Sequence, residues 1–395
     1  MNNSNDGFSG ESTRSVHGGE QRKKFAQSLI NPIAQTATFT FNDLDEFEAF
    51  KGGEKSLYEY GRYGNPTQRA AECKIASLEN AEEALLFSSG MSAITSVLYA
   101  MLRSGQHLII MEDCYRMTAK FCSTLAKFGI ETTLVKPGDF EALTAAVRPE
   151  TRLIFTESPT NPHLHVLDLV QLVAFAKERR LKVLIDSTLA TPINQRPLDF
   201  GVDLVIHSAT KYMGGHNDLM AGVVCGKGAL IDAIREYQRI TGSVVDPNTS
   251  YLLIRGLKTL ALRVVQQNDT AMKIASFLEG HNRVKKVYYP GLPSHVDHEL
   301  AKAQMRGYGG LISFEVAGDL QKTRDFVHRL SLPYLAPSLG GVETLVSHPA
   351  TVSYYDLSSD ERLAIGITDE LVRYAVGIED ADELIGDIEQ ALSGI

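Results

Sequence analysis

The sequence predicts an α/β protein with a mostly parallel sheet, followed by a smaller α+β domain. Three observations lead to this prediction. Short apolar runs alternate with longer helical patterns between residues 65 and 238, which is typical of βαβ units. The apolar runs are nearly continuous, as expected for strands that are covered on both faces. After Asp246-Pro247-Asn248 the pattern changes to a long helix and then to a mixture of strands and helices.

The N-terminal segment, residues 1–61, is predicted to be an extended arm with one short helix at 44–50. Loop signals such as Asn31-Pro32 and Gly52-Gly53 interrupt it, and such a segment has few means of burying itself. We therefore expect it to lie against a neighbouring subunit. The predicted division is this arm, a large domain at 62–255 and a C-terminal domain at 256–395.

The secondary-structure elements are expected in the following order. The large domain should contain strands at 107–111, 132–135, 153–156, 183–185, 204–207 and 222–225. Between them lie expected helices at 67–78, 92–102, 118–128, 167–179 and 230–238. A long helical pattern at 250–279 is expected to be broken or bent near Gly256. Beyond it we expect strands at 284–289, 311–316 and 371–376, and helices at 320–329 and 381–392.

Composition excludes several classes of protein. The 395 residues carry a net charge of -9, which argues against a general nucleic-acid binder and against attachment to anionic membranes. No apolar run approaches the ~20 residues that a membrane span needs, and the first 24 residues are too polar for a secretory signal. We expect a cytoplasmic protein without a metal site, because no Cys/His cluster has zinc spacing and the cysteines are scattered: Cys73, Cys114, Cys122 and Cys225.

Polar residues gather after three successive predicted strands, where ligands bind in open α/β sheets. Lys211 is the most informative of them, because a lysine with a lowered pKa can attack a carbonyl through its amine. Asp186 follows the preceding strand and could hold the nitrogen of a pyridine ring in its protonated form. A surface lysine and a helix-capping aspartate are the structural alternatives.

An anion site is indicated by the segment 87–91, which precedes a predicted helix and carries small residues. Backbone N–H groups at a helix start bind anions, although the same residues form an ordinary helix cap. Ser208 and Thr210 would add hydroxyl groups. Tyr60 and Arg62 lie at the end of the arm, and they would complete a neighbour's site if the arm crosses to a second subunit.

Two further residues could bind a cofactor or a substrate. Tyr115 follows the strand at 107–111, and a flat ring cofactor would give it a stacking role instead of a role in the core. Arg373 lies at the start of a predicted strand of the C-terminal domain. It forms either a surface ion pair or a clamp for the α-carboxylate of an amino acid.

Five motifs occur in order along the chain, at residues 60–67, 88–91, 157–162, 207–212 and 338–343. Together they resemble the Cys/Met-metabolism family of pyridoxal-phosphate enzymes. Within this family the chain is most similar to the cystathionine γ-synthases, the plant-like form in particular. It departs from that pattern at Tyr355, where a Trp is usual, and at Ser187, where Asn or Gly is usual. The match begins near Pro32 and includes all five motifs.

The resemblance implies a type I, aspartate-aminotransferase-like fold with a seven-stranded sheet, the cofactor pyridoxal 5'-phosphate, and amino-acid substrates. It also implies a homotetramer built from dimers with shared active sites. The implied reaction is a γ-replacement that joins O-succinyl-, O-acetyl- or O-phosphohomoserine and cysteine to form cystathionine, a step of transsulfuration in methionine biosynthesis. A γ-lyase acting on cystathionine, methionine or homocysteine, a sulfhydrylase, and a γ-replacement enzyme of specialised metabolism remain open.

The resemblance also implies roles for individual residues. Lys211 would bind the cofactor covalently and move protons, Asp186 would pair with the ring nitrogen, and Tyr115 would stack on the ring and act as acid or base. The phosphate would be bound by Gly90, Met91, Ser208 and Thr210, with Tyr60 and Arg62 of the adjacent subunit. The substrate carboxylate would be bound by Arg373, Asn161 and Ser338. The distal part of the substrate or the incoming cysteine would be read by Glu343, Glu59 and Lys120.

Two readings from other classes are disfavoured. A nicotinamide dehydrogenase would carry G-x-G-x-x-G after its first strand, and this sequence does not. A non-catalytic binding module would not need the predicted catalytic residues, and all of them are present in this sequence.

Overall fold

The computed structural model describes residues 8–395. It contains a seven-stranded sheet with the order β1-β7-β6-β5-β4-β2-β3. All neighbouring strands are parallel except those that pair with β7, which runs antiparallel to β1 and β6. The strands are β1 (Glu83–Phe87), β2 (His107–Met111), β3 (Glu131–Val135), β4 (Thr151–Glu157), β5 (Lys182–Asp186), β6 (Leu204–His207) and β7 (Gly222–Gly226). The predicted fold class is confirmed.

Both faces of this sheet are buried. On β5, Val183 and Ile185 belong to one hydrophobic cluster, whereas Leu184 belongs to another on the opposite face. The alternation arises because successive side chains of a strand point to opposite faces. The covering helices are α3 (Pro66–Glu79), α4 (Gly90–Met101), α5 (Arg116–Thr124), α6 (Phe140–Ala146), α7 (Leu169–Glu178), α8 (Thr191–Asn194) and α9 (Gly228–Thr241).

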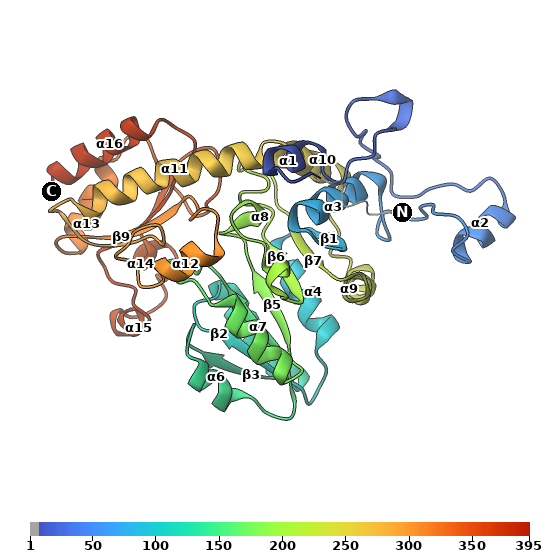
Figure 1. Ribbon diagram of the computed structural model, residues 1–395, viewed down its shortest axis with the longest axis horizontal. Helices are drawn as coiled ribbons and strands as arrows, with labels where there is room; N and C mark the ends of the chain where they lie inside the picture. The colour runs from blue at the N-terminus through green and yellow to red at the C-terminus, as the bar shows by residue number, and fades with distance from the viewer. Residues whose placement is uncertain (1–7) are drawn as a thin grey trace.

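A second, mostly antiparallel sheet of five strands has the order β10-β11-β12-β9-β8. Figure 1 shows it at the C-terminal end of the molecule, beside the long helix α11. Its strands are β8 (Val284–Tyr288), β9 (Leu311–Val316), β10 (Tyr334–Leu335), β11 (Leu345–Ser347) and β12 (Leu371–Ala375). Its helices are α12 (His298–Gln304), α13 (Leu320–Arg329), α14 (Pro349–Val352), α15 (Ser359–Ala364) and α16 (Ala381–Ser393).

The predicted long helix is two helices, α10 (Pro247–Leu257) and α11 (Leu260–Glu279). The expected interruption is therefore a break, which confirms the prediction. It follows Gly256, where an added Cβ would lie 2.3 Å from the carbonyl oxygen of Gly214. Only a glycine allows the two backbones to approach so closely.

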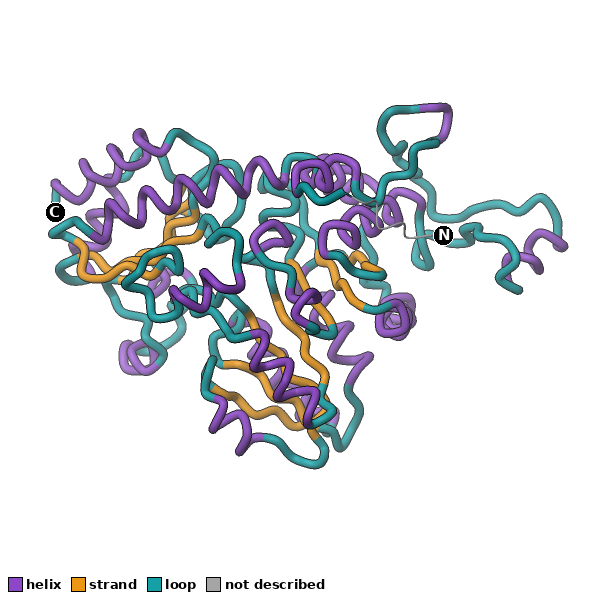
Figure 2. The backbone as a smooth tube through the Cα atoms, viewed as in Figure 1, coloured by secondary structure: helices purple, strands orange, loops and turns teal. Residues whose placement is uncertain are grey.

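The N-terminal arm differs in one respect from its prediction. Besides α2 (Leu44–Lys51) it contains a second helix, α1 (Glu11–His17), which packs on α3 and α11. The buried Lys74 holds α1 by donating hydrogen bonds to the carbonyl oxygens of Ser15 and Val16 at 3.1 and 2.9 Å. The remainder of the arm is mostly loop and extends away from the sheets (Figure 2). Its apolar side chains are open to solvent, with Phe25 81% and Leu29 87% exposed.

Several elements of the large sheet region were not predicted correctly. Strand β1 was missed, because the run Glu83–Phe87 is short and begins with a charged residue. The short helices α6 and α8 were also not predicted. Helix α5 ends at Thr124, and a separate 3-10 turn continues to Phe128. The domain boundaries remain predictions. No helix among the described residues is long and apolar enough to cross a membrane.

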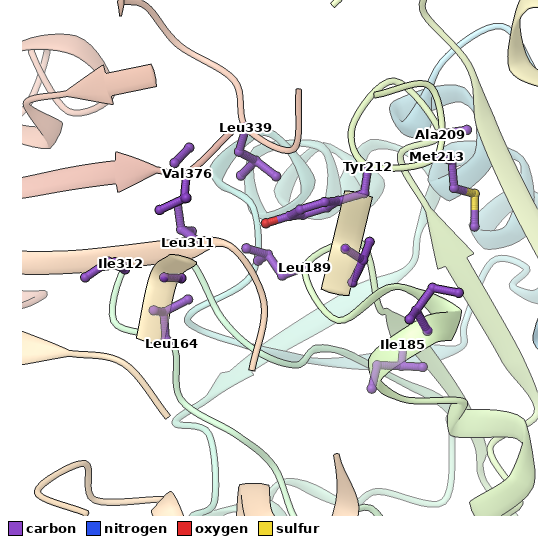
Figure 3. Packing of buried hydrophobic residues seen from close by; sticks show 14 of the residues in the cluster. Leu164, Ile185, Leu189, Ala209, Tyr212, Met213, Leu311, Ile312, Leu339 and Val376 are labelled. Carbon is purple, nitrogen blue, oxygen red and sulfur yellow. The ribbon is translucent and has the colours of Figure 1, made fainter. Parts of the chain in front are cut away.

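Tyr212 follows Lys211 in the chain and packs where the two sheets meet. Its ring is buried among Leu189, Leu339 and Val376, as Figure 3 shows. Its hydroxyl accepts a hydrogen bond from the Gly310 N–H at 3.2 Å, and its carbonyl accepts one from Arg263 at 2.7 Å. Lys211 is therefore anchored at the junction of the two sheets.

Candidate active site

The carboxyl ends of β4, β5 and β6 open into one cavity of about 600 Å³. Glu157 at the end of β4 is paired in register with Asp186 at the end of β5. The residues that follow β6 reach the same edge of the sheet, as the parallel arrangement requires. Most of the predicted site residues line this cavity: Gly90, Met91, Tyr115, Lys120, Asn161, Asp186, Ser208, Thr210, Lys211, Ser338 and Arg373.

The Lys211 amine lies in this cavity and donates a hydrogen bond to the Ser338 hydroxyl at 2.7 Å. Burial, and after it the positive charge of Arg373, together lower the pKa of Lys211 to about 8. A lysine with such a pKa has a substantial fraction of free amine near neutral pH. It can therefore attack a carbonyl carbon and can also accept and return protons.

Asp186 is buried beneath the cavity. One carboxylate oxygen, Oδ1, accepts hydrogen bonds from the N–H and the hydroxyl of Thr188 at 3.0 and 2.5 Å. The other oxygen has no hydrogen bond within residues 8–395. Burial raises the pKa of Asp186, and the two bonds from Thr188 oppose that rise. A cationic ring nitrogen would supply the missing partner and favour the carboxylate.

The first turn of α4 forms an anion cradle at the cavity. Ser89 caps this helix, with Ser89 and Ser92 each donating a backbone N–H to the other's hydroxyl at 3.0 Å. An added Cβ at Gly90 would lie 3.0 Å from the Cβ of Ser208, so a larger residue would fill the cradle. Backbone N–H groups and the helix dipole make this position suitable for a phosphate group. The Thr210 hydroxyl is already bonded to Ala221, donating at 3.2 Å and accepting at 3.0 Å.

Arg373 approaches the cavity from β12 of the second sheet. Its guanidinium donates to the Ser338 carbonyl oxygen at 2.8 Å, while its Nε is buried without a partner in the described part of the chain. Ser338 has a φ of 103°, which is a strained conformation for a residue with a Cβ. The strained Ser338 thus touches both Lys211 and Arg373, and Arg373 keeps a donor for an additional anion.

Four predicted site residues lie outside this cavity. Arg62 donates to the Arg239 carbonyl oxygen at 2.6 Å and stacks on Tyr60 and Tyr63. Glu59 forms an ion pair with Lys51 at 2.7 Å. Glu343 accepts a hydrogen bond from Asn217 at 2.8 Å and lines a neighbouring cavity, which shares Thr210 and Ser338 with the first. The chain therefore does not bring Tyr60, Arg62 or Glu59 to its own Lys211.

The structure adds residues that sequence reasoning did not assign. Glu157 and Thr188 lie within or beside the segments already singled out, so the strand-end rule could have found them. The ion pair between Arg116 and Asp356 had no such signal. It joins α5 to the loop after α14 at the edge of the cavity, with Nη1 and Oδ1 2.5 Å apart. No His, Cys, Asp and Glu cluster within residues 8–395 has the arrangement of a metal site.

The sequence matches the family model of the Cys/Met metabolism PLP-dependent enzymes over residues 12–393. The chain belongs to this family. It is thus a pyridoxal-phosphate-dependent enzyme with a type I fold, and the free Asp186 oxygen, the α4 cradle and Lys211 form a site that fits the cofactor.

Several known proteins are similar over nearly the whole chain. The chloroplastic cystathionine γ-synthase 1 of Arabidopsis thaliana is 47% identical, and the alignment covers 98% of this chain and 70% of that protein. The L-methionine γ-lyase of Pseudomonas putida is 41% identical over 97% of both chains. The crystal structure of metB from Corynebacterium glutamicum has a TM-score of 0.92 at 36% identity and covers 99% of both chains.

A second solved structure with a TM-score of 0.92 is the cystathionine γ-synthase of Xanthomonas oryzae pv. oryzae in complex with aminoacrylate and cysteine. It is 34% identical, and the match covers 97% of this chain and 98% of that one.

The pKa of Lys211 predicts how cofactor uptake depends on pH. Below about pH 8 the amine is mostly protonated, so the rate at which cofactor-free protein takes up pyridoxal phosphate should rise about tenfold per pH unit. Above pH 8 the rate should level off. Arg373→Met should move this inflection to higher pH, because it removes a positive charge that lowers the pKa. Stopped-flow absorbance measures the rate; an inflection that does not move would contradict the assignment.

Proposed function

We propose that this enzyme joins an O-activated homoserine to cysteine by γ-replacement and releases cystathionine. The observation that carries the proposal is the 47% identity to a cystathionine γ-synthase across 98% of the chain. The cavity supports it, because it combines a nucleophilic lysine with a buried arginine that has a donor to spare.

The proposed mechanism assigns proton transfer to Lys211. Pyridoxal phosphate, when bound, withdraws electrons from the carbon atoms of an attached amino acid. Lys211 would hold the cofactor until the substrate amine takes the place of the Lys211 amine. The freed Lys211 amine would then remove and return the protons at Cα and Cβ of the substrate. Its pKa of about 8 allows transfer in both directions near neutral pH.

Other residues bind and orient. Asp186 would pair with the ring nitrogen and hold it in the protonated form. The half-buried Tyr115 stacks on the ring and supplies an acid or base near the leaving group. The phosphate is bound at Gly90, Met91, Ser208 and Thr210, where the N-terminus of α4 favours an anion.

The substrate is held from the second sheet. Arg373 binds the α-carboxylate with Ser338 and Asn161, which line the same cavity. Lys120 lines that cavity further along α5, and Glu343 lines the neighbouring one. These two, with Glu59 of the arm, are proposed to read the distal substituent of the homoserine and the incoming cysteine.

We also propose a cytoplasmic homotetramer built from dimers with shared active sites. The arm supports this arrangement, because it exposes large apolar side chains that a partner subunit would bury. Tyr60 and Arg62 lie on that arm, away from the Lys211 of their own chain. In the oligomer they would reach the phosphate end of the partner's cavity.

The shared site can be tested with two defective variants. Arg62→Ala should weaken cofactor binding and thereby abolish most of the activity, and Lys211→Ala should be inactive. When the two are unfolded together and reassembled in equal amounts, half of the dimers are hybrids with one intact site. Activity should then return to about one quarter of the wild-type value, as random pairing requires. No recovery in verified hybrids would show that Arg62 serves its own chain.

The reaction itself is tested with three donors. Purified holoenzyme is incubated with O-succinyl-, O-acetyl- or O-phosphohomoserine, each with and without cysteine, and the products are identified by mass spectrometry. We expect cystathionine to form with at least one donor, and only when cysteine is present. Failure of all three donors would overturn the proposal.

A γ-lyase is the second candidate function. Relatives named L-methionine γ-lyase and cystathionine γ-lyase are 41% and 42% identical over 97% of the chain. A γ-lyase needs the same lysine, ring-binding aspartate and carboxylate clamp, so the cavity by itself does not separate the two reactions. They differ in whether a thiol or water consumes the intermediate.

A further inference from the structure

Glu157 is a buried acid in the active-site cavity that the mechanism does not use. It ends β4, lies beside Asp186 in the sheet register and is only 6% exposed. It lines the same cavity as Tyr115 and Lys211. A carboxyl group in such a place is costly unless it is neutral or well bonded.

The side chain of Glu157 has one hydrogen bond among the described residues, and it accepts that bond from the backbone of Tyr115. Its Oε2 accepts the Tyr115 N–H at 2.8 Å. Tyr115 is the N-cap residue of α5, and its own side chain makes no capping bond. The Tyr115 ring is half-exposed in the cavity, so packing alone does not hold it. Glu157 therefore holds the backbone of Tyr115 in place at the start of α5, beside the cavity.

The surroundings of Glu157 favour its uncharged form. Burial raises the pKa of Glu157 well above its ordinary value, and the negative charges of Asp186 and Asp113 raise it further. The bond from Tyr115 opposes this rise. No cation forms an ion pair with Glu157 in the described part of the chain. An ionised Glu157 would place a second negative charge beside Asp186.

We propose that Glu157 is a positioning residue that, as an uncharged acid, fixes the backbone of Tyr115 and so sets where the Tyr115 ring lies in the cavity. It acts through Tyr115 and not on the reacting atoms. The catalytic part of this inference rests on the proposed function, whereas the structural part does not.

Two substitutions separate the hydrogen bond from the charge. Glu157→Gln keeps an oxygen that can accept the Tyr115 N–H, but it cannot ionise. Glu157→Met keeps a similar size and removes the acceptor. Glu112→Gln is the matched control, because Glu112 lies before Tyr115 in the same loop but does not line the cavity. Thermal unfolding is measured first, and Glu157→Leu replaces Glu157→Met if the latter does not fold.

Amide hydrogen exchange of Tyr115, followed by mass spectrometry in the cofactor-free and the loaded protein, reads the bond directly. We expect exchange at least about tenfold faster in Glu157→Met and within about twofold of wild type in Glu157→Gln, as loss of one buried hydrogen bond predicts. kcat should fall at least about tenfold in Glu157→Met and stay within about threefold in Glu157→Gln. Glu112→Gln should change neither quantity.

The outcomes decide the inference. Unchanged Tyr115 exchange in Glu157→Met would overturn it, because the bond would then not hold the backbone. Equal loss of kcat in Glu157→Gln and Glu157→Met would also overturn it, since a charged Glu157 would be required. If the enzyme catalyses a different reaction, the exchange result is unaffected, so failure of the proposed function is distinguishable.

Discussion

Alanine in place of Lys211 should lower kcat by about four orders of magnitude or more, since it removes both the nucleophile that binds the cofactor and the base that moves the protons. The visible absorption band of the yellow holoenzyme should also disappear. The protein should still fold, because within residues 8–395 the Lys211 side chain makes a single hydrogen bond, to Ser338. Absorbance spectra and steady-state rates measure both effects.

Lys74 provides a matched control for this prediction. It is also buried, and burial likewise lowers its pKa to about 8. Its amine faces the carbonyl oxygens of α1 and the carboxylate of Glu20 instead of the cavity. Lys74→Met should keep the visible band while loosening the N-terminal segment. A visible band that survives in Lys211→Ala would show that another lysine holds the cofactor.

Asp186→Asn is the second substitution with a large expected effect. It keeps the size of the side chain and removes the negative charge that is proposed to pair with the ring nitrogen. We expect kcat to fall by about two to three orders of magnitude, because an uncharged ring withdraws electrons poorly. The cofactor should also dissociate more readily. Rate measurements and equilibrium dialysis of pyridoxal phosphate test these effects.

The direction of the change in melting temperature distinguishes loss of the Asp186 charge from damage to the fold. Burial raises the pKa of Asp186, so the carboxylate is costly in the cofactor-free protein and becomes favourable only beside a cation. Asp186→Asn should therefore leave the melting temperature of the cofactor-free protein unchanged or raised, and lower that of the loaded protein. Asp186→Glu, which keeps the charge, should retain more activity. A cofactor-free Asp186→Asn protein that melts early would contradict this account.

The sequence predicted those strands and site residues whose position depends only on one strand and the residues that directly follow it. The strands at 107–111 and 204–207 are nearly continuous apolar runs, and the structure places β2 and β6 at the same residues. Asp186 and Lys211 could be singled out because the end of a parallel strand is where ligands bind. Strand β1 was not predicted, because it begins with Glu83 and its position depends on antiparallel pairing with β7.

Contacts between distant segments could not be predicted in this way. The pairing of Arg116 with Asp356 and the bond from Lys211 to Ser338 depend on how the second sheet docks beside the first. Glu157 was visible as a strand-end residue, but its partner is a backbone N–H that follows another strand. No residue-type pattern marks such a bond. The resemblance to a known family supplied Ser338 and Asn161, which local patterns alone did not indicate.

The separation of synthase from lyase depends on which molecule consumes the intermediate. Water and cysteine compete in the same cavity, so the ratio of their products is independent of how well the enzyme was loaded with cofactor. This ratio can be read in one reaction vessel at several cysteine concentrations.

The most direct test of the proposed function is therefore the partition of an O-activated homoserine between cystathionine and 2-oxobutanoate at saturating cysteine. The purified holoenzyme receives the best donor, and both products are quantified from the same samples; cystathionine and methionine are then offered alone. We predict that cystathionine is the main product and that neither amino acid alone is cleaved at a comparable rate. Predominant 2-oxobutanoate at saturating cysteine, or rapid cleavage of cystathionine or methionine, would contradict the assignment and identify a γ-lyase.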